Sequence, residues 1–304
     1  TWCLASCRQT PTRTHYRITG SLGFLRPISN FGPWPVAPGS GFDYRAPAMP
    51  VQIPEPVRPH PYLTQHYRDG GEKRAWLQSI FDDTAHDYDR VERWLALGSG
   101  RWYRRQALKR AGLGAGMIVA DVACGTGLVA REAVGIVGQG GRVVGIDPSP
   151  GMLKHARDAV NIEVRSGRAE AIPEASDTFD FLSMGYALRH VDDLGSAFNE
   201  FGRVLKPGGR VCILEITSPD SRAGRLLMAS YMRVISGICC RIGGRSKRTR
   251  ELWQYYWDTI DQCVRPEAVM GALAAAGFTD VRRVVPLGMF SEYTATKPLA
   301  SPLA

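Results

Sequence analysis

Two glycines and an aspartate in the middle of this chain have a spacing that suits a nucleotide-like ligand. The segment Val119-Ala-Asp-Val-Ala-Cys-Gly-Thr-Gly127 runs from an apolar stretch into a helical pattern. Gly125 and Gly127 lack a Cβ, so a turn built on them lets the backbone approach a ligand closely. Asp147 follows 20 residues after Gly127, where a carboxylate can accept hydrogen bonds from both hydroxyls of a ribose. In the purely structural alternative, the glycines form a turn and Asp147 caps a helix. The coupled arrangement favours an adenosine-containing ligand.

Asp121 decides between two such ligands. The pattern Gly125-x-Gly127-x-x-Ala130 also matches the fingerprint of a dinucleotide site. The carboxylate of Asp121, however, would face a pyrophosphate that needs hydrogen-bond donors. The ammonium group of S-adenosylmethionine would instead be attracted to it. We therefore expect S-adenosylmethionine as the cofactor and Asp121 among its contacts. An NAD-dependent oxidoreductase and a catalytically inactive nucleotide-binding module remain the alternatives of a different class.

Strand and helix patterns alternate along the rest of the chain. Short apolar runs predict seven strands, at Met117–Val122, Arg142–Ile146, Ile162–Val164, Phe179–Met184, Arg210–Ile216, Val281–Val285 and Phe290–Ala295. Helical periodicity lies between most of them, at Leu128–Val137, Met152–Val160, Asp192–Leu205 and Pro266–Ala276. Parallel strands need such crossover helices. The pattern predicts a doubly wound, mostly parallel seven-stranded α/β sheet of the Rossmann-like type, with an antiparallel edge strand contributed by the last two runs.

Composition divides the chain into two parts. Residues 1–70 are rich in proline and show no lasting period, so we expect a disordered or extended segment. Residues 71–304 are expected to form one domain, with helical cap elements at 72–112 and 221–260. Residues 1–42 contain arginine and no acidic residue, which fits either an organellar transit segment, extending to residue 48 if Met49 is the true start, or a misassigned upstream region.

Charge and cysteine content exclude several classes of protein. The chain has no apolar run of about 18 residues, so a membrane-spanning helix is not expected. Its seven cysteines are scattered, without the spacing of a zinc site or a disulfide framework. The net charge of +9 is spread too thinly to indicate nucleic-acid binding. We expect no metal, no nucleic-acid partner and a cytoplasmic location, or an organellar one if the transit reading is correct.

Several motifs together resemble a known family. They are Phe81-Asp-Asp-Thr-Ala-His-Asp-Tyr-Asp89, Asp121-Val-Ala-Cys-Gly-Thr-Gly127, Ala169-Glu-Ala-Ile-Pro173, Ala187-Leu-Arg-His-Val191 and Arg203-Val-Leu-Lys-Pro-Gly-Gly-Arg210. From Gly71 onward the chain resembles the class I S-adenosylmethionine-dependent methyltransferases. Within them it is most similar to the C-methyltransferases of ubiquinone and menaquinone biosynthesis. The resemblance implies methyl transfer to a hydrophobic aromatic acceptor, with a quinol ring carbon as first choice and O- or N-methylation of another small molecule as the alternative.

The resemblance also assigns the cofactor contacts. It implies Gly125 and Thr126, with Gly127, at the methionine end, Asp147 at the ribose, Arg168 and Ala169 at the adenine edge, and Gly185 beyond the fourth strand. Arg168 departs from the family pattern, which has Asp or Asn there as an acceptor for the adenine amino group. Because arginine is a donor only, the backbone, stacking on the ring or another group must replace that contact. Gly185 stands where the quinone enzymes tend to have Ser.

Three residues are candidates for the chemistry. Removing a phenolic proton raises the electron density of a quinol ring carbon, so a general base assists its methylation. His190 is the candidate base and Arg189 the candidate stabiliser of the phenolate; an imidazole beside a helix without any role is the alternative for His190. Tyr88, by resemblance, closes over the methyl donor.

The segment after the fifth predicted strand is a candidate lid over the acceptor. Ser221–Ile260 has an apolar body, and residues 241–250 add five basic side chains (Arg241, Arg245, Lys247, Arg248 and Arg250). These residues would either contact an anionic membrane surface peripherally or form a solvated charged turn. The sequence does not indicate the oligomeric state.

Overall fold

Short runs of apolar and β-branched residues form a single mixed sheet. The computed structural model describes residues 44–45, 57–95, 99–219, 221–242 and 247–300. Within them the strands are β1 (Tyr44–Arg45), β2 (Ile118–Val122), β3 (Arg142–Asp147), β4 (Glu163–Ser166), β5 (Phe179–Gly185), β6 (Leu205–Ile216), β7 (Thr279–Val284) and β8 (Phe290–Thr296).

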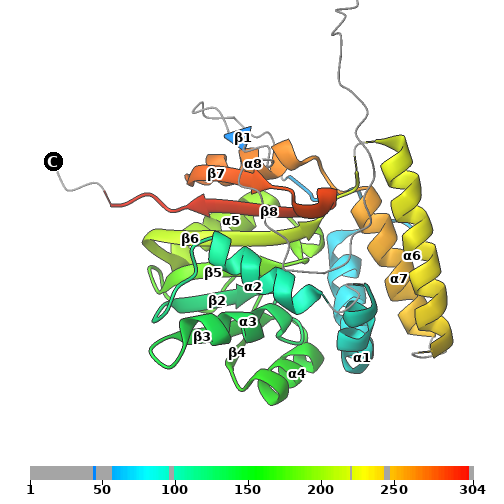
Figure 1. Cartoon of the computed structure of the whole chain (residues 1–304), viewed down its shortest axis with the longest axis horizontal. Coiled ribbons are helices and arrows are strands. Elements are labelled where there is room, and N and C mark those ends of the chain that lie inside the picture. Colours follow the sequence, from blue (N-terminus) through cyan, green and yellow to red (C-terminus); the bar gives the residue numbers. More distant parts are fainter. Residues whose placement is uncertain (1–43, 46–56, 96–98, 220, 243–246, 301–304) are drawn as a thin grey trace, which may run out of the picture. The chain divides into compact units, whose positions relative to one another are not determined.

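The order of the strands is β1-β7-β8-β6-β5-β2-β3-β4 (Figure 1). Strands β4, β3, β2, β5 and β6 pair in parallel, whereas β8 is antiparallel to both β6 and β7. The predicted doubly wound seven-stranded sheet with an antiparallel end is confirmed. The reversed strand β8 lies inside β7 rather than at the outer edge, and the two-residue strand β1 pairs with β7 as an eighth strand.

Helices cover both faces of this sheet. They are α2 (Gly100–Arg110), α3 (Leu128–Val137), α4 (Pro150–Val160), α5 (Leu194–Val204) and α8 (Pro266–Ala275). One buried cluster joins the sheet to α2, α3 and α4 through residues such as Leu108, Val129 and Leu153. The cluster on the other face joins it to α5 and α8 through Phe198 and Leu273. Both faces are apolar because a parallel sheet is buried on both sides.

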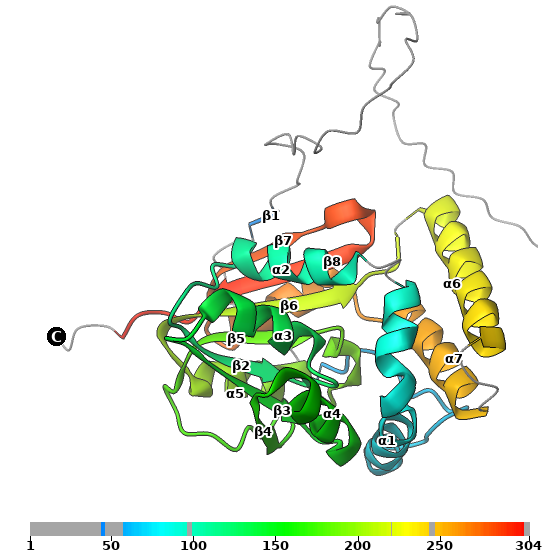
Figure 2. The same ribbon diagram turned by 60° about the horizontal axis from the view of Figure 1, so that its bottom comes forward.

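Three further helices form a cap, which Figures 1 and 2 show at one end of the sheet. They are α1 (Gly70–Leu95), α6 (Arg222–Ile242) and α7 (Lys247–Asp261), so the single helical stretch expected over 221–260 is divided into two helices. The cap has its own buried cluster, which includes Met228 and Met232 of α6 and Trp253 and Tyr255 of α7. Residues 57–69 contain no helix or strand, yet they add Leu63 and Tyr67 to this cluster.

Arg248 ties two of the cap helices together. Its guanidinium lies 3.2 Å from Asp83 of α1, 3.2 Å from Glu251 of α7 and 3.3 Å from Ser79 of α1. The other four basic side chains of the 241–250 segment lie outside the described part of the structure. Membrane contact through this segment, like the domain boundary at residue 70, therefore stays a prediction.

The chain changes direction across the sheet at β2. From β2 it proceeds outward to β3 and β4, and it then returns to β5 and β6 on the other side. Ligands of doubly wound sheets bind at the carboxyl ends of the strands beside such a switch point. Asp147 ends β3 and Gly185 ends β5, so the fold brings these two predicted residues to the same edge.

Gly185 allows a close packing of β5 against α3. A Cβ on Gly185 would lie 2.5 Å from Val129 Cγ2, a separation that real Cβ atoms do not adopt. We expect Gly185→Ala to lower the free energy of unfolding by about 1–3 kcal/mol, since an added methyl strains a well-packed interior. Urea unfolding measures this.

The same substitution at Gly271 of α8 is a matched control. A Cβ there meets nothing within 4 Å, so Gly271→Ala should stabilise the protein by up to about 1 kcal/mol. The cost at Gly185 should also shrink in a Val129→Ala background. Equal changes in the free energy of unfolding for Gly185→Ala and Gly271→Ala would contradict the close contact between Gly185 and Val129.

Candidate active site

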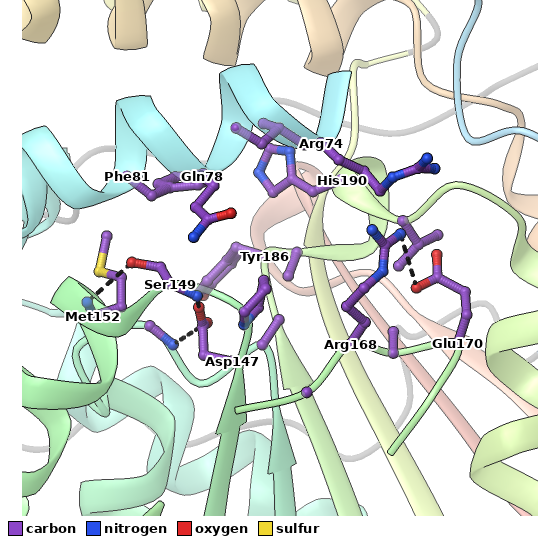
Figure 3. A pocket seen from close by; sticks show the side chains of 18 of the residues that line it. Arg74, Gln78, Phe81, Asp147, Ser149, Met152, Arg168, Glu170, Tyr186 and His190 are labelled. Atoms are coloured by element: carbon purple, nitrogen blue, oxygen red, sulfur yellow. Dashed lines mark hydrogen bonds and ion pairs between the residues drawn. The ribbon is translucent and has the colours of Figure 1, made fainter. Parts of the chain in front are cut away.

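A cavity of about 390 Å³ lies at the carboxyl ends of the central strands (Figure 3). One wall follows β3 and carries Asp147, Ser149 and Met152, and the opposite wall belongs to α1 and the turn after β5. The lining residues are Arg74, Leu77, Gln78, Phe81, Ala123, Gly125, Asp147, Pro148, Ser149, Met152, Gly167, Arg168, Ala169, Glu170, Gly185, Tyr186, Ala187, His190 and Val191. Its volume is within the usual range for a small-molecule site.

The loop after β2 is held in a left-handed conformation that exposes its backbone. Ala123, Gly125 and Gly127 have φ angles of 54°, 55° and 85°. A Cβ on Gly127 would also lie 2.8 Å from Val160 Cγ2, whereas a Cβ on Gly125 would meet nothing within 4 Å. Gly127 therefore serves packing against α4. Gly125 faces open space and leaves room for a ligand beside the backbone.

Asp147 lies on the cavity wall. Its carboxylate accepts hydrogen bonds from the backbone N–H groups of Gly125 and Ser149, each at 2.9 Å. A carboxylate has about four acceptor sites, so two remain for hydroxyl groups of a ligand. Burial raises the pKa of Asp147 to about 6, against the effect of the two N–H donors. Ser149, rather than Asp147, caps α4: its Oγ accepts from the Met152 N–H at 3.1 Å.

Asp121 lies behind the loop, outside the cavity lining. Its side chain is fully buried. One carboxylate oxygen accepts from the Ala130 N–H at 3.0 Å and the other from Ser183 Oγ at 2.7 Å. Burial raises the pKa of Asp121 to about 7. The geometry makes Asp121 a support for the start of α3, and its contact with a ligand's ammonium group stays a prediction.

Helix α1 supports the same two loops from the other side. Asp82 Oδ1 accepts from Ser149 Oγ at 2.5 Å and from the Gly151 N–H at 2.9 Å. Asp89, seven residues later on the same helix face, accepts from Thr126 Oγ1 at 2.5 Å. The hydroxyl of Thr126 is thus bound to α1, and Thr126 is absent from the cavity lining. The side chain of Tyr88 lies outside the described residues.

Arg168 and Ala169 both line the cavity, and their contact with the adenine edge stays a prediction. The guanidinium of Arg168 donates to Asp192 at 2.6 Å and lies 3.5 Å from Glu170. Asp192 also pairs with Arg74 at 3.0 Å. The backbone N–H and carbonyl of Arg168 bond to Ala171. A small ionic network, rather than a lone carboxylate, therefore borders this end of the cavity.

His190 lines the cavity from the short 3₁₀ turn Leu188–His190 that follows β5. Its Nδ1 lies 2.9 Å from Tyr255 Oη, and its ring stacks on Tyr255 and meets Phe81 edge-on. Burial lowers the pKa of His190 well below its usual value, and the positive charges of Arg189, Lys73 and His60 add to this effect. The imidazole is therefore neutral at physiological pH.

Arg189 points away from the cavity. Its buried guanidinium pairs with Glu215 of β6 and lies over the ring of Tyr256, 5.4 Å from the centroid. Arg189 is absent from the cavity lining, and its contact with a phenolate stays a prediction. The buried ion pair anchors the turn that carries His190.

Sequence reasoning missed the α1 wall and Tyr255. Arg74, Leu77, Gln78 and Phe81 share one helix face through spacings of three and four residues, but the same pattern is typical of core packing. Tyr255 lies 65 residues beyond its partner His190, and no local pattern connects the two.

The cavity fits S-adenosylmethionine. Asp147 offers unused acceptor sites for a ribose, and Gly125 leaves space next to a loop backbone. Among the residues described, no group of three or more His, Cys, Asp or Glu side chains is arranged to hold a metal ion.

Comparison with known proteins assigns the family. The model of the ubiE/COQ5 methyltransferase family matches residues 68–297. The chain belongs to the ubiE/COQ5 methyltransferase family. It is 34% identical over 240 residues to the ubiquinone/menaquinone biosynthesis C-methyltransferase UbiE of Geobacter sulfurreducens, with 75% of this chain and 91% of the relative covered. It is 32% identical over 216 residues to the 2-phytyl-1,4-naphtoquinone methyltransferase of Thermosynechococcus vestitus, with 70% and 94% covered.

Solved structures agree on the fold of this family member. A SAM-dependent methyltransferase of Thermotoga maritima, described as a possible histamine N-methyltransferase, superimposes with a TM-score of 0.52 and 22% identity, covering 73% of this chain and 99% of that one. Membership of the ubiE/COQ5 family makes the protein an S-adenosylmethionine-dependent methyltransferase and excludes the oxidoreductase alternative. In the described part of the chain, no helix is long and apolar enough to cross a membrane.

The raised pKa of Asp147 gives a pH-dependent affinity. The carboxylate must be ionised to accept two hydroxyls, so affinity for S-adenosylhomocysteine should be constant above about pH 7 and fall by up to about tenfold per pH unit below about pH 6. Calorimetric titration across this range measures it. Asp147→Asn should bind weakly throughout and lack the step near pH 6. A step that persists unchanged in this variant would contradict the role of Asp147.

Proposed function

We propose that the protein transfers a methyl group from S-adenosylmethionine to a ring carbon of a hydrophobic quinol. The observation that carries this proposal is the composition of the cavity. A carboxylate and a glycine loop lie on one side, and on the other His190 lies among Leu77, Phe81 and Val191. The two relatives named above, whose names specify quinone substrates, support the same acceptor class.

The residues on the two sides have different tasks. Asp147 and the Gly125 loop bind and orient the methyl donor, which supplies a methyl group on a positively charged sulfur and leaves as S-adenosylhomocysteine. Leu77 and Phe81 of α1 give the acceptor ring an apolar surface and exclude water. Holding the two reactants in line supplies most of the acceleration, since effective molarities of about 10⁵ M or more follow from such positioning.

His190 moves the proton in this mechanism. Its neutral ring accepts the phenolic proton as the ring carbon attacks the methyl group. The ring carbon then loses its own hydrogen as a proton to water, which restores the aromatic ring as a phenolate, and His190 returns its proton to the phenolate oxygen. Because Arg189 pairs with Glu215, its task is to keep the Leu188–His190 turn in place rather than to contact the phenolate.

The acceptor and the base can be tested together. The protein, labelled methyl donor and reduced quinones extracted from membranes should give a product whose label is bonded to a ring carbon and which can still be oxidised to a quinone, whereas methylation of either redox hydroxyl would block that oxidation. His190→Ala should lower turnover about 10²–10⁴-fold and change the affinity for S-adenosylhomocysteine by only a few fold. Mass analysis and calorimetry provide the two readouts.

The exposed histidine His155 of α4 is the matched control, and His155→Ala should leave turnover unchanged. Methyl transfer to oxygen or nitrogen alone would overturn the choice of a carbon acceptor. Equal loss of turnover and cofactor affinity in His190→Ala would remove the base assignment.

A further inference from the structure

Tyr255 of α7 lies at the point where the cap meets the candidate base. Its side chain is fully buried, and its hydroxyl lies 2.9 Å from His190 Nδ1, with the two rings stacked at 5.4 Å between centroids and 22° between planes. Nδ1 is therefore engaged in a hydrogen bond with Tyr255 of the cap. Nε2 is the ring nitrogen left for a substrate proton.

The direction of this hydrogen bond determines what Nε2 can do. A neutral imidazole carries one proton, on either nitrogen. If Nδ1–H donates to Tyr255 Oη, Nε2 is an acceptor and can take a proton. If the Tyr255 hydroxyl donates to Nδ1, Nε2 carries the proton and cannot act as a base.

The surroundings of Tyr255 favour the first direction. Burial raises the pKa of Tyr255 well above its usual value, so the hydroxyl keeps its proton. The ring of Tyr67 meets Tyr255 edge-on, with the centroids 6.4 Å apart. The interaction between the two hydroxyls acts to lower the pKa of Tyr67 and to raise that of Tyr255, which makes the Tyr255 hydroxyl the donor toward Tyr67. Tyr255 Oη then accepts from His190.

We propose that Tyr255 is a positioning residue that fixes His190 in the Nδ1–H tautomer and so leaves Nε2 as the proton acceptor. This rests on the proposed function of His190 and deepens it. Helix α7 thereby contributes to the chemistry without lining the cavity, since its docking is what brings the hydroxyl to Nδ1.

Nitrogen-15 NMR of histidine side chains tests the tautomer without any turnover. The full chain has 6 histidines, and His190→Asn identifies the signal of His190 by its disappearance. The wild-type protein should show a protonated Nδ1 and an unprotonated Nε2. Tyr255→Phe keeps the ring and removes the hydroxyl, so it should populate the other tautomer and lower turnover about tenfold or more, with unchanged affinity for S-adenosylhomocysteine.

Tyr103→Phe is the matched control, since Tyr103 is another buried tyrosine and packs on Phe290 outside the cavity lining; it should alter neither readout. An unprotonated Nδ1 in the wild type, or an unchanged tautomer in Tyr255→Phe, would overturn the proposal. If the tautomer shifts as expected but His190→Ala retains full turnover, the role of His190 as a base fails and the positioning by Tyr255 stands.

Helix α6 carries a second, independent feature, an apolar face that none of the described residues covers. Leu226, Leu227 and Val234 are 67%, 73% and 59% exposed, while Met228 and Met232 on the opposite face are buried in the cap. Figures 1 and 2 show α6 at the outer side of the cap, with α7 on its inner side. We call the surface formed by Leu226, Leu227 and Val234 the α6 face.

The charged residues of α6 itself are all arginine. Arg222, Arg225 and Arg233 are exposed on the same helix, and the 21 residues of α6 include no Asp or Glu. A second copy of the chain would bring the same arginines against this face, and like charges would oppose that contact. A helix with exposed leucines and arginines and no acid matches the pattern of an interfacial membrane helix.

We infer that the α6 face binds the surface of an anionic lipid bilayer. The three aliphatic side chains would enter the boundary between headgroups and acyl chains, while the arginines pair with anionic headgroups. The buried side of α6 belongs to the cap cluster, so such docking would place the cap next to the membrane.

Co-sedimentation with phosphatidylcholine vesicles, with or without phosphatidylglycerol, tests this without measuring activity. The full chain should bind the anionic vesicles and not the neutral ones. Leu226→Ser combined with Leu227→Ser should weaken binding about tenfold or more, and Arg222→Gln should weaken it about fivefold. Leu299→Ser is the matched control at a residue 77% exposed in the stretch after β8.

Absence of vesicle binding, or binding that the α6 variants leave unchanged, would overturn the inference. Light scattering determines whether the α6 face instead mediates a dimer. A dimer that the two leucine substitutions dissociate would assign the α6 face to a second copy of the chain instead.

Discussion

The active site depends on two carboxylates buried at the carboxyl ends of adjacent parallel strands. A buried carboxylate is costly unless donors surround it, and here each carboxylate uses donors that fix a loop. Asp121 takes the backbone N–H of Ala130 and the hydroxyl of Ser183. Asp147 takes the N–H groups of Gly125 and Ser149. These bonds fix the positions of the first residues of α3 and α4 and of the loop that precedes α3. The cofactor pocket is therefore preorganised before any ligand arrives.

The cap completes the pocket with groups that the sheet cannot supply. Asp82 and Asp89 attach α1 to the same two loops, and this attachment brings Leu77 and Phe81 over the acceptor side of the cavity. Helix α7 adds Tyr255 behind His190. The division of labour follows from chemistry: the sheet edge provides acceptors for a sugar, and the cap provides an apolar surface and controls a proton.

The sequence predicted the part of this site that depends on local signals. The glycine loop, Asp147 at the end of its strand and the order of strands and helices follow from short patterns, and the structure confirms the fold. Three features escaped prediction because they depend on contacts distant in sequence. The carboxylate of Asp121 accepts a hydrogen bond from Ser183, the guanidinium of Arg189 pairs with Glu215, and the His190 ring contacts Tyr255 of α7. Whether a polar residue faces the ligand or the protein is decided by partners that no local pattern specifies.

A crystal structure of the full chain with S-adenosylhomocysteine tests the central claim most directly. The account predicts both ribose hydroxyls on the carboxylate of Asp147, the sulfur on the side of His190, and Asp121 still bonded to Ala130 and Ser183. A ribose bound elsewhere, with Asp147 unused, or an Asp121 that leaves its two donors to contact the ligand, would contradict it.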